Sequence, residues 1–179
     1  MFKEPRDGGT AMKRFSIGDK VVHSPEGVCE IEDICIMDVD KEKKQFYKLR
    51  SVVESDKVLY ISCACKNPAI RHLKSVEEAE RILKLEAEEG ILSQCSNVEK
   101  RITMQKRAIM DDNSELLIRL IKTYVRNSQY KEISVGDNNW LKAAEKYLLS
   151  ELAELMGVSY TDMQQAIAAS ITKDFVFVA

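Results

Sequence analysis

The chain has 179 residues, of which 45% are hydrophobic and 31% charged, with a formal net charge of −2. This length fits one domain or two small ones, and seven Gly with three Pro is the composition of a globular protein. The small negative net charge excludes an overall positive potential that would attract nucleic acid. No apolar run approaches the ~20 residues of a membrane span.

The N-terminal stretch predicts a leader that lies outside the fold. Residues 1–12 contain Gly8-Gly9 and show no apolar periodicity, so we expect them to be flexible. They also lack the continuous apolar core of a secretory signal. We therefore expect the folded part to begin at about residue 13.

The five Cys residues are an odd number without the spacing of a disulfide framework. Free thiols at this density indicate a reducing compartment, so we predict a cytoplasmic protein. Cys63 and Cys65 are two positions apart, which on a strand places both side chains on one face. No second Cys pair or His-x-x-x-His follows to complete a zinc site, so we expect neither a metal nor another cofactor.

Residues 15–62 carry the signals of short strands. The polar segment 38–44 fits the tip of one hairpin, and residues 54–56 fit a second turn. A sheet made of fewer than fifty residues buries little apolar surface unless it curls on itself. We therefore predict a small SH3- or Tudor-like antiparallel β-barrel. The runs rich in Val, Ile, Phe and Tyr that form its strands are 20–23, 28–36, 45–51 and 57–62.

The apolar period changes to that of helices near residue 75. Ser75 and Glu78 form a capping box, and Gly90 is the expected end of the helix that follows. Asp112 or Ser114 is expected to open a later helix. Other helices are predicted over 98–110, 134–157 and 159–171. The predicted fold class is α+β, with a β-barrel domain at 13–74, an all-helical domain at 75–173, and an apolar tail of no assigned role at 174–179.

No motif in the chain predicts catalysis. P-loop, nucleophile-elbow, zinc-protease and dinucleotide-binding patterns are all absent from the sequence. His23 and His72 have no orienting acid close in sequence, and such His residues are more often structural. Trp140 lies on a strongly amphipathic helix, so core packing is expected rather than a role as a wedge between bases. We predict a binding protein and not an enzyme.

The region 97–131 has a local excess of positive charge, with eight basic residues against four acidic ones. Two interpretations are open, namely helices that contact DNA phosphates and helix faces that are simply solvated. Sequence-specific readout is not indicated, because no known recognition helix is present. The first interpretation assigns phosphate contacts to Lys100, Arg101, Lys106 and Arg107.

Three blocks of the sequence resemble one protein family. Residues 15–34, FSIGDKVVHSPEGVCEIEDI, are similar to the N-terminal signature of the CarD/CdnL family of bacterial transcription factors. Residues 69–83, AIRHLKSVEEAERIL, look like the Ile-Arg linker and Ser-x-Glu-Glu helix between the two domains of that family. Residues 134–157 resemble its Leu- and Ala-rich helical stretch. The resemblance covers about residues 13–158, with the three blocks in the family's order.

The resemblance implies a transcription regulator in two parts. The Tudor-like domain would bind the β subunit of bacterial RNA polymerase by pairing an edge strand with it. The helical domain would contact promoter DNA at the upstream edge of the melted bubble, modulating open-complex stability. The positions that match the family's polymerase contacts are Met37, Lys57, Val58, Leu59, Tyr60 and Ile61.

Some positions depart from the family's pattern. Tyr60 and Met37 stand where members of the family often carry basic residues, and Val98 stands where many have a Trp that wedges into the minor groove. Val98 offers less area to a base step, so wedging should be weaker or absent. Binding through the phosphate backbone is still expected, and the positions assigned to DNA are Val98, Lys100, Arg101, Lys106 and Arg107.

The sequence therefore favours a monomeric, non-enzymatic regulator that binds RNA polymerase and promoter DNA, without a membrane role. One alternative is a protein adaptor that docks on polymerase without DNA contact. Another is a free-standing relative of the polymerase-interacting domain of transcription-repair coupling factors, although the motor motifs of those proteins are absent from this sequence. An enzyme of unknown type has no motif to support it.

Overall fold

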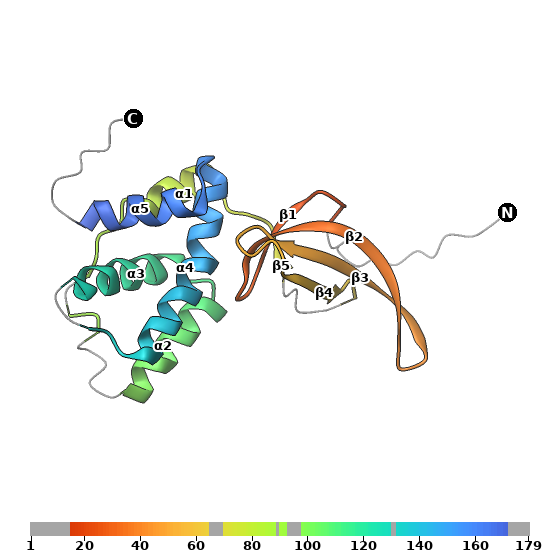
Figure 1. Ribbon diagram of the computed structural model, residues 1–179, viewed down its shortest axis with the longest axis horizontal. Coiled ribbons are helices and arrows are strands. Elements are labelled where there is room, and N and C mark those ends of the chain that lie inside the picture. The colour runs from red at the N-terminus through yellow and green to blue at the C-terminus, as the bar shows by residue number, and fades with distance from the viewer. Residues whose placement is uncertain (1–14, 65–69, 89, 93–97, 130–131, 172–179) are drawn as a thin grey trace, which may run out of the picture.

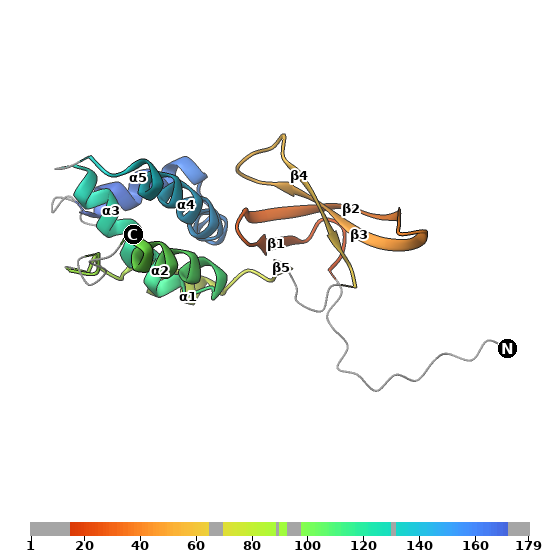
Figure 2. The same cartoon turned by 90° about the horizontal axis from the view of Figure 1, so that it is seen from below.

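The computed structural model describes residues 15–64, 70–88, 90–92, 98–129 and 132–171, so the predicted leader and tail lie outside the described residues. A five-stranded antiparallel sheet is followed by helices, which confirms the predicted fold class. Sheet and helices lie next to each other along the long axis of the molecule (Figures 1 and 2). The strands are β1 (Lys20–His23), β2 (Gly27–Val39), β3 (Glu42–Ser51), β4 (Val58–Ser62) and β5 (Ile70–Arg71).

The sheet has the strand order β4-β3-β2-β1-β5, which leaves β4 and β5 as its outer strands. Within the described residues these two strands do not pair with each other, so the barrel-like sheet keeps two edges. The short strand β5 corrects an expectation, because Ile70 and Arg71 were assigned to a linker. They pair instead with His23 and Val22 of β1, which adds the β5 strand to the sheet.

The β2–β3 hairpin is longer than the sequence predicted. The strands continue to Val39 and restart at Glu42, so residues 38–44 are mostly strand and not a loop. Asp40 and Lys41 both have positive φ, and a two-residue turn of this kind matches the twist of the flanking strands. A register shift between Ile31 and Asp33 marks a bulge, which bends β2 as it leaves the core.

The two faces of the sheet bury their residues in different cores. One face encloses a small cluster with Leu49 and Ile31 at its centre. The opposite face, at the β1–β2 turn, carries Val22 and Val28, and both belong to the core of the helical domain. The sheet is therefore packed directly onto the helices. The residues of the small cluster are Val21, Cys29, Ile31, Tyr47, Leu49 and Ile70.

The helices are α1 (Val76–Leu83), α2 (Val98–Met110), α3 (Ser114–Ser128), α4 (Val135–Met156) and α5 (Tyr160–Ile171). The predicted starts of α1 and α5 are correct. The Ser75 and Ser159 hydroxyls each accept a hydrogen bond from the backbone amide three residues later. The N-cap of α3 is Asn113, between the two predicted positions, and its side chain accepts from the Leu116 amide.

Helix α1 is shorter than predicted, because it ends at Leu83 and not near Gly90. The buried Lys122 Nζ donates to the Leu83 carbonyl at 2.9 Å and satisfies one of the carbonyls left free at the helix end. A tertiary contact therefore caps the end of this helix. Nothing in the local sequence marked that position.

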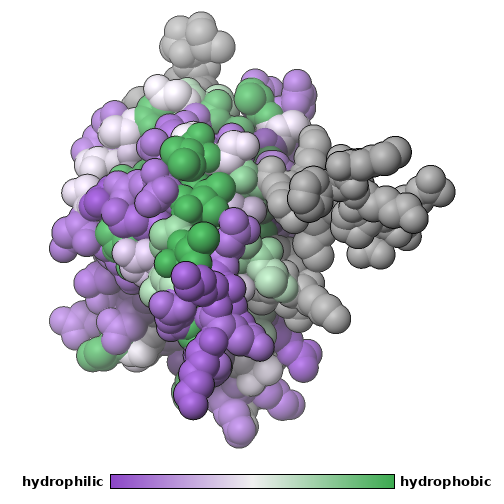
Figure 3. Space-filling model, turned by 90° about the vertical axis from the view of Figure 1, so that its right-hand side faces the viewer, coloured by the Kyte–Doolittle hydropathy of each residue, from purple (hydrophilic) through white to green (hydrophobic). Residues whose placement is uncertain are grey.

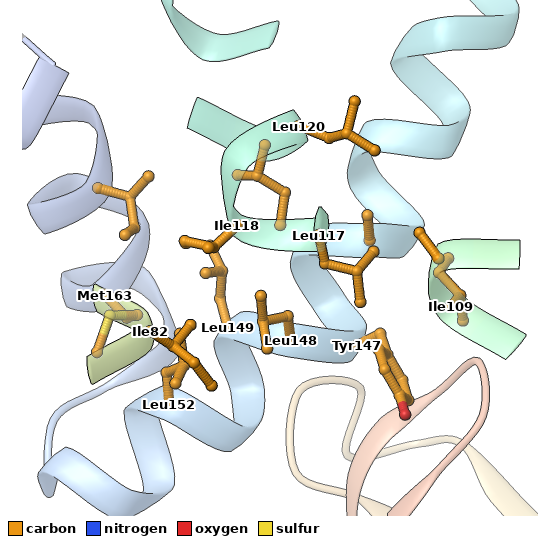
Figure 4. Packing of buried hydrophobic residues seen from close by; sticks show 14 of the residues in the cluster. Ile82, Ile109, Leu117, Ile118, Leu120, Tyr147, Leu148, Leu149, Leu152 and Met163 are labelled. Atoms are coloured by element: carbon orange, nitrogen blue, oxygen red, sulfur yellow. The ribbon is translucent and has the colours of Figure 1, made fainter. Parts of the chain in front are cut away.

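The helical core is built around α3 and α4. Leu117 and Ile118 of α3 lie beside Leu148 and Leu149 of α4, and all four are fully buried (Figure 4). Trp140 packs against this cluster, with its ring 5.5 Å from that of Tyr124, which agrees with the packing role expected for it. Helix α4 also faces the sheet, so it belongs to both halves of the molecule.

Gly27 marks the closest approach of the sheet to α4. Its φ is +80°, and a Cβ atom here would lie 2.3 Å from both the Lys146 carbonyl oxygen and Ser150 Oγ. The next residue, Val28, donates its amide to Ser150 Oγ at 2.9 Å in a buried position. Only glycine allows the turn between β1 and β2 to contact the helix backbone in this way.

We expect Gly27→Ala to destabilise the protein much more than Gly18→Ala. Both glycines have positive φ, and the left-handed conformation costs an alanine about 1 to 2 kcal/mol at either site. At Gly27 the clash with α4 should add about 1 to 3 kcal/mol, whereas a Cβ at Gly18 meets nothing within 4 Å. Urea denaturation of the two variants measures the difference, and equal losses would contradict the close packing.

Candidate functional site

Among the described residues, no strand pairs with the outer edge of β4, so this edge can accept another strand. The Lys57 carbonyl accepts from the Ser51 amide, and the Cys63 amide donates to the Gln45 carbonyl. Because backbone groups of an antiparallel strand alternate in direction, the odd-numbered residues 57–63 bond to β3. Val58, Tyr60 and Ser62 therefore turn their amides and carbonyls toward the open edge. This is the arrangement that strand addition requires.

The side chains of β4 divide between the two faces of the sheet. Leu59 and Ile61 turn inward and pack against the small core, so their contribution to any docking is structural. Tyr60 lies on the outer face and is 49% exposed. By register, Met37 lies on the same face, but on β2, beyond the intervening strand β3. The structure thus gathers Tyr60 and Met37 on one surface without bringing them into contact.

Apolar side chains gather at the sheet end of the molecule. Figure 3, which faces that end, shows hydrophobic residues in a band between hydrophilic side chains. On β2, the exposed apolar residues are Ile36, 64% exposed, and Met37, 37% exposed. Exposed apolar groups on a sheet are typical of a protein-binding surface, although these two lie on β2 and not at the edge of β4.

Lys57 is the one predicted docking residue that is already engaged through its side chain in ion pairs. Its Nζ lies 2.7 Å from Glu26 and 3.7 Å from Glu54. Lys146 of α4 binds the same two carboxylates at 2.7 and 3.1 Å. Burial alone would raise the pKa of Glu26, but hydrogen bonds from Lys146 and Lys57 lower it below its usual range. Lys57 and Lys146 therefore connect the start of β4 to the helical domain through the carboxylates they share.

A second polar cluster lies at the seam between sheet and helices, and the sequence did not predict it. Glu151 of α4 is fully buried and accepts from both terminal nitrogens of Arg71, at 2.6 and 2.7 Å. Its carboxylate also accepts the Lys74 amide at 2.8 Å. A Glu within the buried run of α4 is a signal that the sequence does contain. Its partner 80 positions away cannot be found from sequence spacing.

Asp112 completes this seam cluster from the turn between α2 and α3. It binds Arg71 at 2.8 Å and Lys74 at 2.7 Å, and accepts from the Tyr147 hydroxyl at 2.9 Å. Burial alone would raise the pKa of Asp112, but Lys74 and Arg71 hold it below its usual range. Burial likewise opposes charge on Arg71, yet bonds to Glu151 raise its pKa above the ordinary value.

The predicted DNA-facing residues all lie on α2, but they differ in availability. Lys100, Lys106 and Arg107 are exposed, and Val98 is 57% exposed at the start of the helix. Arg101 is instead turned toward α4, where its Nε and a terminal nitrogen each lie 3.1 Å from an Asp137 oxygen. Arg101 is thus committed to an internal ion pair.

Asp137 is the centre of a network that attaches α2 and α3 to the start of α4. Its carboxylate accepts from Tyr124 and Ser134, each at 2.7 Å, and from Gln105 at 3.0 Å, besides the two bonds from Arg101. Burial alone would raise the pKa of Asp137, but these hydrogen bonds lower it to about 2. Burial and Asp137 raise the pKa of Tyr124 beyond its usual range.

A groove of about 220 Å³ runs between α2 and the start of α4. Val98 and Ile102, both more than 40% exposed, form one wall, and Trp140 forms part of the other. Lys106 also lines it, so the groove combines apolar walls with a positive charge. The Trp140 indole Nε1 is buried and has no hydrogen-bond partner among the described residues.

The described residues offer no set of three or more His, Cys, Asp or Glu that could hold a metal ion. Cys63 lies beside the small core, while Cys65 falls outside the described residues. His23 is buried, and desolvation lowers its pKa below the usual value. Within the same residues, no helix is long and apolar enough to cross a membrane.

Comparison with protein families matches residues 15–74 to the CarD-like/TRCF RID domain. The match spans the sheet and ends just before α1, covering about a third of the chain. No curated protein matches the chain.

We expect Asp137→Asn to reduce the acid sensitivity of the fold. An Asp with a folded-state pKa of about 2, against about 3.9 when unfolded, contributes stability that is present above pH 4. That stability is lost as pH falls from about 4 toward 2. The variant should be less stable at neutral pH, with a smaller slope of unfolding free energy between those values. Chemical denaturation at a series of pH values measures both quantities.

Asp38→Asn, at an exposed position of β2, is the matched control and should leave the slope unchanged. An unchanged slope in Asp137→Asn as well would show that Asp137 does not hold its charge through these bonds.

Proposed function

Residues 15–74 belong to the CarD-like/TRCF RID domain family, a non-catalytic family that interacts with RNA polymerase, and from this premise we propose a bacterial transcription regulator. Its sheet docks on the β subunit of RNA polymerase, and its helical domain contacts promoter DNA and modulates open-complex stability. The observation that carries the proposal is the open edge of β4 in a domain of this family. In this proposal the protein is a cytoplasmic, non-enzymatic monomer.

Docking by strand addition explains why the side-chain departures from the family can be tolerated. Backbone amides and carbonyls at Val58, Tyr60 and Ser62 supply hydrogen bonds whatever the side chains are. Tyr60 and Met37 then add apolar contact on the outer face, in place of the charges that other members use there. Because Lys57 is held by Glu26 and Glu54, its role is to position the strand and not to contact the polymerase.

DNA contact is assigned to the exposed cations of α2. Lys100, Lys106 and Arg107 are free to neutralise phosphates, whereas Arg101 positions the helix through Asp137. Phosphate contacts give affinity without sequence readout. Val98 lies at the exposed start of the helix but lacks the aromatic surface of a wedge.

A second candidate is an adaptor that docks on polymerase without touching DNA. Two observations favour it, namely Val98 in the wedge position and the internal pairing of Arg101. Both reduce the surface that α2 can offer to a duplex. The two candidates share the polymerase-docking strand and differ only in the role of α2.

We expect Tyr60→Pro to abolish binding to RNA polymerase, while Tyr60→Ala weakens it only partly. Proline removes the amide that faces the open edge but no bond to β3, and edge positions of this kind tolerate proline. Alanine keeps the amide and removes only the side chain. Pull-down with a β-subunit fragment measures the loss, which should exceed tenfold for proline.

Circular dichroism of both variants checks that the sheet is intact. If a folded Tyr60→Pro variant binds as well as the wild type, docking through the edge of β4 is wrong.

We expect the double variant Lys106→Ala/Arg107→Ala to bind DNA with a reduced salt dependence. Each phosphate contact that is removed should lower the slope of log affinity against log salt by about 1, so the double variant should lose about 2. Binding to a DNA duplex with a melted bubble is measured by gel shift across a salt series.

Lys43→Ala/Lys84→Ala removes two exposed cations elsewhere on the molecule and is the matched control. Equal slopes for the two double variants would remove α2 from the DNA surface. Absence of any binding by the wild type, alone or on polymerase, would favour the adaptor.

A further inference from the structure

Arg101 differs from the other basic residues of α2 in the direction of its side chain. Its side chain is 23% exposed, and its Nε and a terminal nitrogen each lie 3.1 Å from an oxygen of Asp137 on α4. The guanidinium group is therefore paired inside the helical domain, where it holds α2 against the start of α4. The cations that remain exposed on the same helix are Lys100, Lys106 and Arg107.

Asp137 keeps hydrogen bonds to both of its carboxylate oxygens without Arg101. Its Oδ1 also accepts from the Tyr124 hydroxyl at 2.7 Å and from the Gln105 amide at 3.0 Å. Its Oδ2 also accepts from the Ser134 hydroxyl at 2.7 Å. Asp137 lies in the first turn of α4, where the helix dipole favours a negative charge. Departure of Arg101 would therefore not leave an uncompensated carboxylate in the protein.

The ion pair between Arg71 and Glu151 has the opposite property. Glu151 is fully buried, and Arg71 donates to both of its oxygens. The Lys74 amide donates to Oε1, while Lys74 Nζ lies 4.0 Å from Oε2. Without Arg71, Oε2 would have no hydrogen bond from these partners. Of the two arginines, only Arg101 can leave its carboxylate with all the oxygens of that carboxylate still bonded.

The side chain of Arg101 has open space on two sides. It lines the groove of about 220 Å³ between α2 and α4 together with Lys106. It also lines a second hollow of about 510 Å³, which Asn127 and Glu132 border. A change of rotamer therefore does not require Arg101 to enter the packed core. A phosphate at the groove would meet the charge of Lys106, and the planar guanidinium group binds a phosphate in the same two-pronged way as a carboxylate.

We propose that Arg101 exchanges Asp137 for a phosphate of the DNA backbone when α2 docks on promoter DNA. Arg101 and Lys106 then hold this phosphate together at the groove between α2 and α4. In the free protein the pair with Asp137 positions α2 and withholds one cation from its surface. Affinity for DNA is thus set by competition between a carboxylate and a phosphate for one guanidinium group. The inference rests on the proposed function, because it concerns the helix assigned to DNA.

The side-chain Nε–H signals of the arginines report the exchange directly. In the full chain labelled with ¹⁵N, addition of a DNA duplex with a melted bubble should shift the Arg101 Nε–H signal, because its acceptor changes from a carboxylate to a phosphate. The Arg71 signal is the internal reference and should stay in place, since Glu151 depends on that residue. Arg101→Gln identifies the Arg101 signal by its loss.

Gel shift across a salt series measures the energetic side of the exchange. Arg101→Gln should lower the slope of log affinity against log salt by about 1, because one phosphate contact is lost. Asp137→Asn should raise the affinity about two- to fivefold, since release of Arg101 no longer breaks an ion pair. Asp137→Asn should give no such gain when it is combined with Arg101→Gln. Circular dichroism checks that each variant is folded under the conditions of the assay.

Asp111→Asn is the matched control for the change in charge. Asp111 is an exposed acid directly after α2, and its neutralisation alters the net charge by the same amount as Asp137→Asn. Its effect on DNA affinity should be equal in the presence and absence of Arg101. A gain that depends on Arg101 is therefore expected for Asp137→Asn alone.

Three outcomes overturn the proposal, and they separate it from the proposed function. The exchange is wrong, and DNA contact through α2 stands, if Arg101→Gln leaves the salt slope unchanged while Lys106→Ala/Arg107→Ala lowers it by about 2. Equal gains from Asp137→Asn with and without Arg101 would assign the effect to net charge and not to release of the guanidinium group. Absence of DNA binding by the wild type, alone and on polymerase, would overturn the exchange together with the DNA role of the helical domain.

Discussion

The ion pair between Arg71 and the buried carboxylate of Glu151 joins the two halves of the molecule. A carboxylate without exposure to solvent costs several kcal/mol unless it is paired and hydrogen-bonded. Here Arg71 binds it through two nitrogens and the Lys74 amide adds a third hydrogen bond. These partners come from the last strand and the segment before α1, so the charge is satisfied only when sheet and helices are docked. Separation of the halves would leave Glu151 without its partners.

The contacts around this pair define how the sheet sits on α4. Gly27 allows the β1–β2 turn to approach the backbone of α4. The hydroxyl of Ser150, the residue before Glu151, accepts a hydrogen bond from the Val28 amide. Val22 and Val28 enter the helical core on the same side. Polar and apolar contacts thus fix one orientation together, because the hydrogen bonds specify geometry while the burial of apolar surface supplies most of the free energy.

This seam fixes the distance between the two proposed binding surfaces. The open edge of β4 belongs to the sheet, and the cations of α2 belong to the helical domain, so a complex with both partners depends on their relative placement. The ion pairs of Glu26 with Lys57 and Lys146 connect the start of β4 to α4, and the ion pair of Arg101 with Asp137 connects α2 to α4. Helix α4 is therefore the common support of both surfaces.

Local signals in the sequence determined most of the elements. Short runs rich in Val, Ile, Phe and Tyr marked β1 to β4, and the caps Ser75, Ser134 and Gly157 marked helix ends, because capping depends on residues a few positions apart. The family signature marked the sheet as a polymerase-interacting domain. What only the tertiary structure decided were contacts between distant residues. Lys122 caps the end of α1, β5 pairs with β1, Arg101 binds Asp137, and Arg71 binds Glu151. None of these contacts has a fixed spacing along the chain that a pattern can reveal.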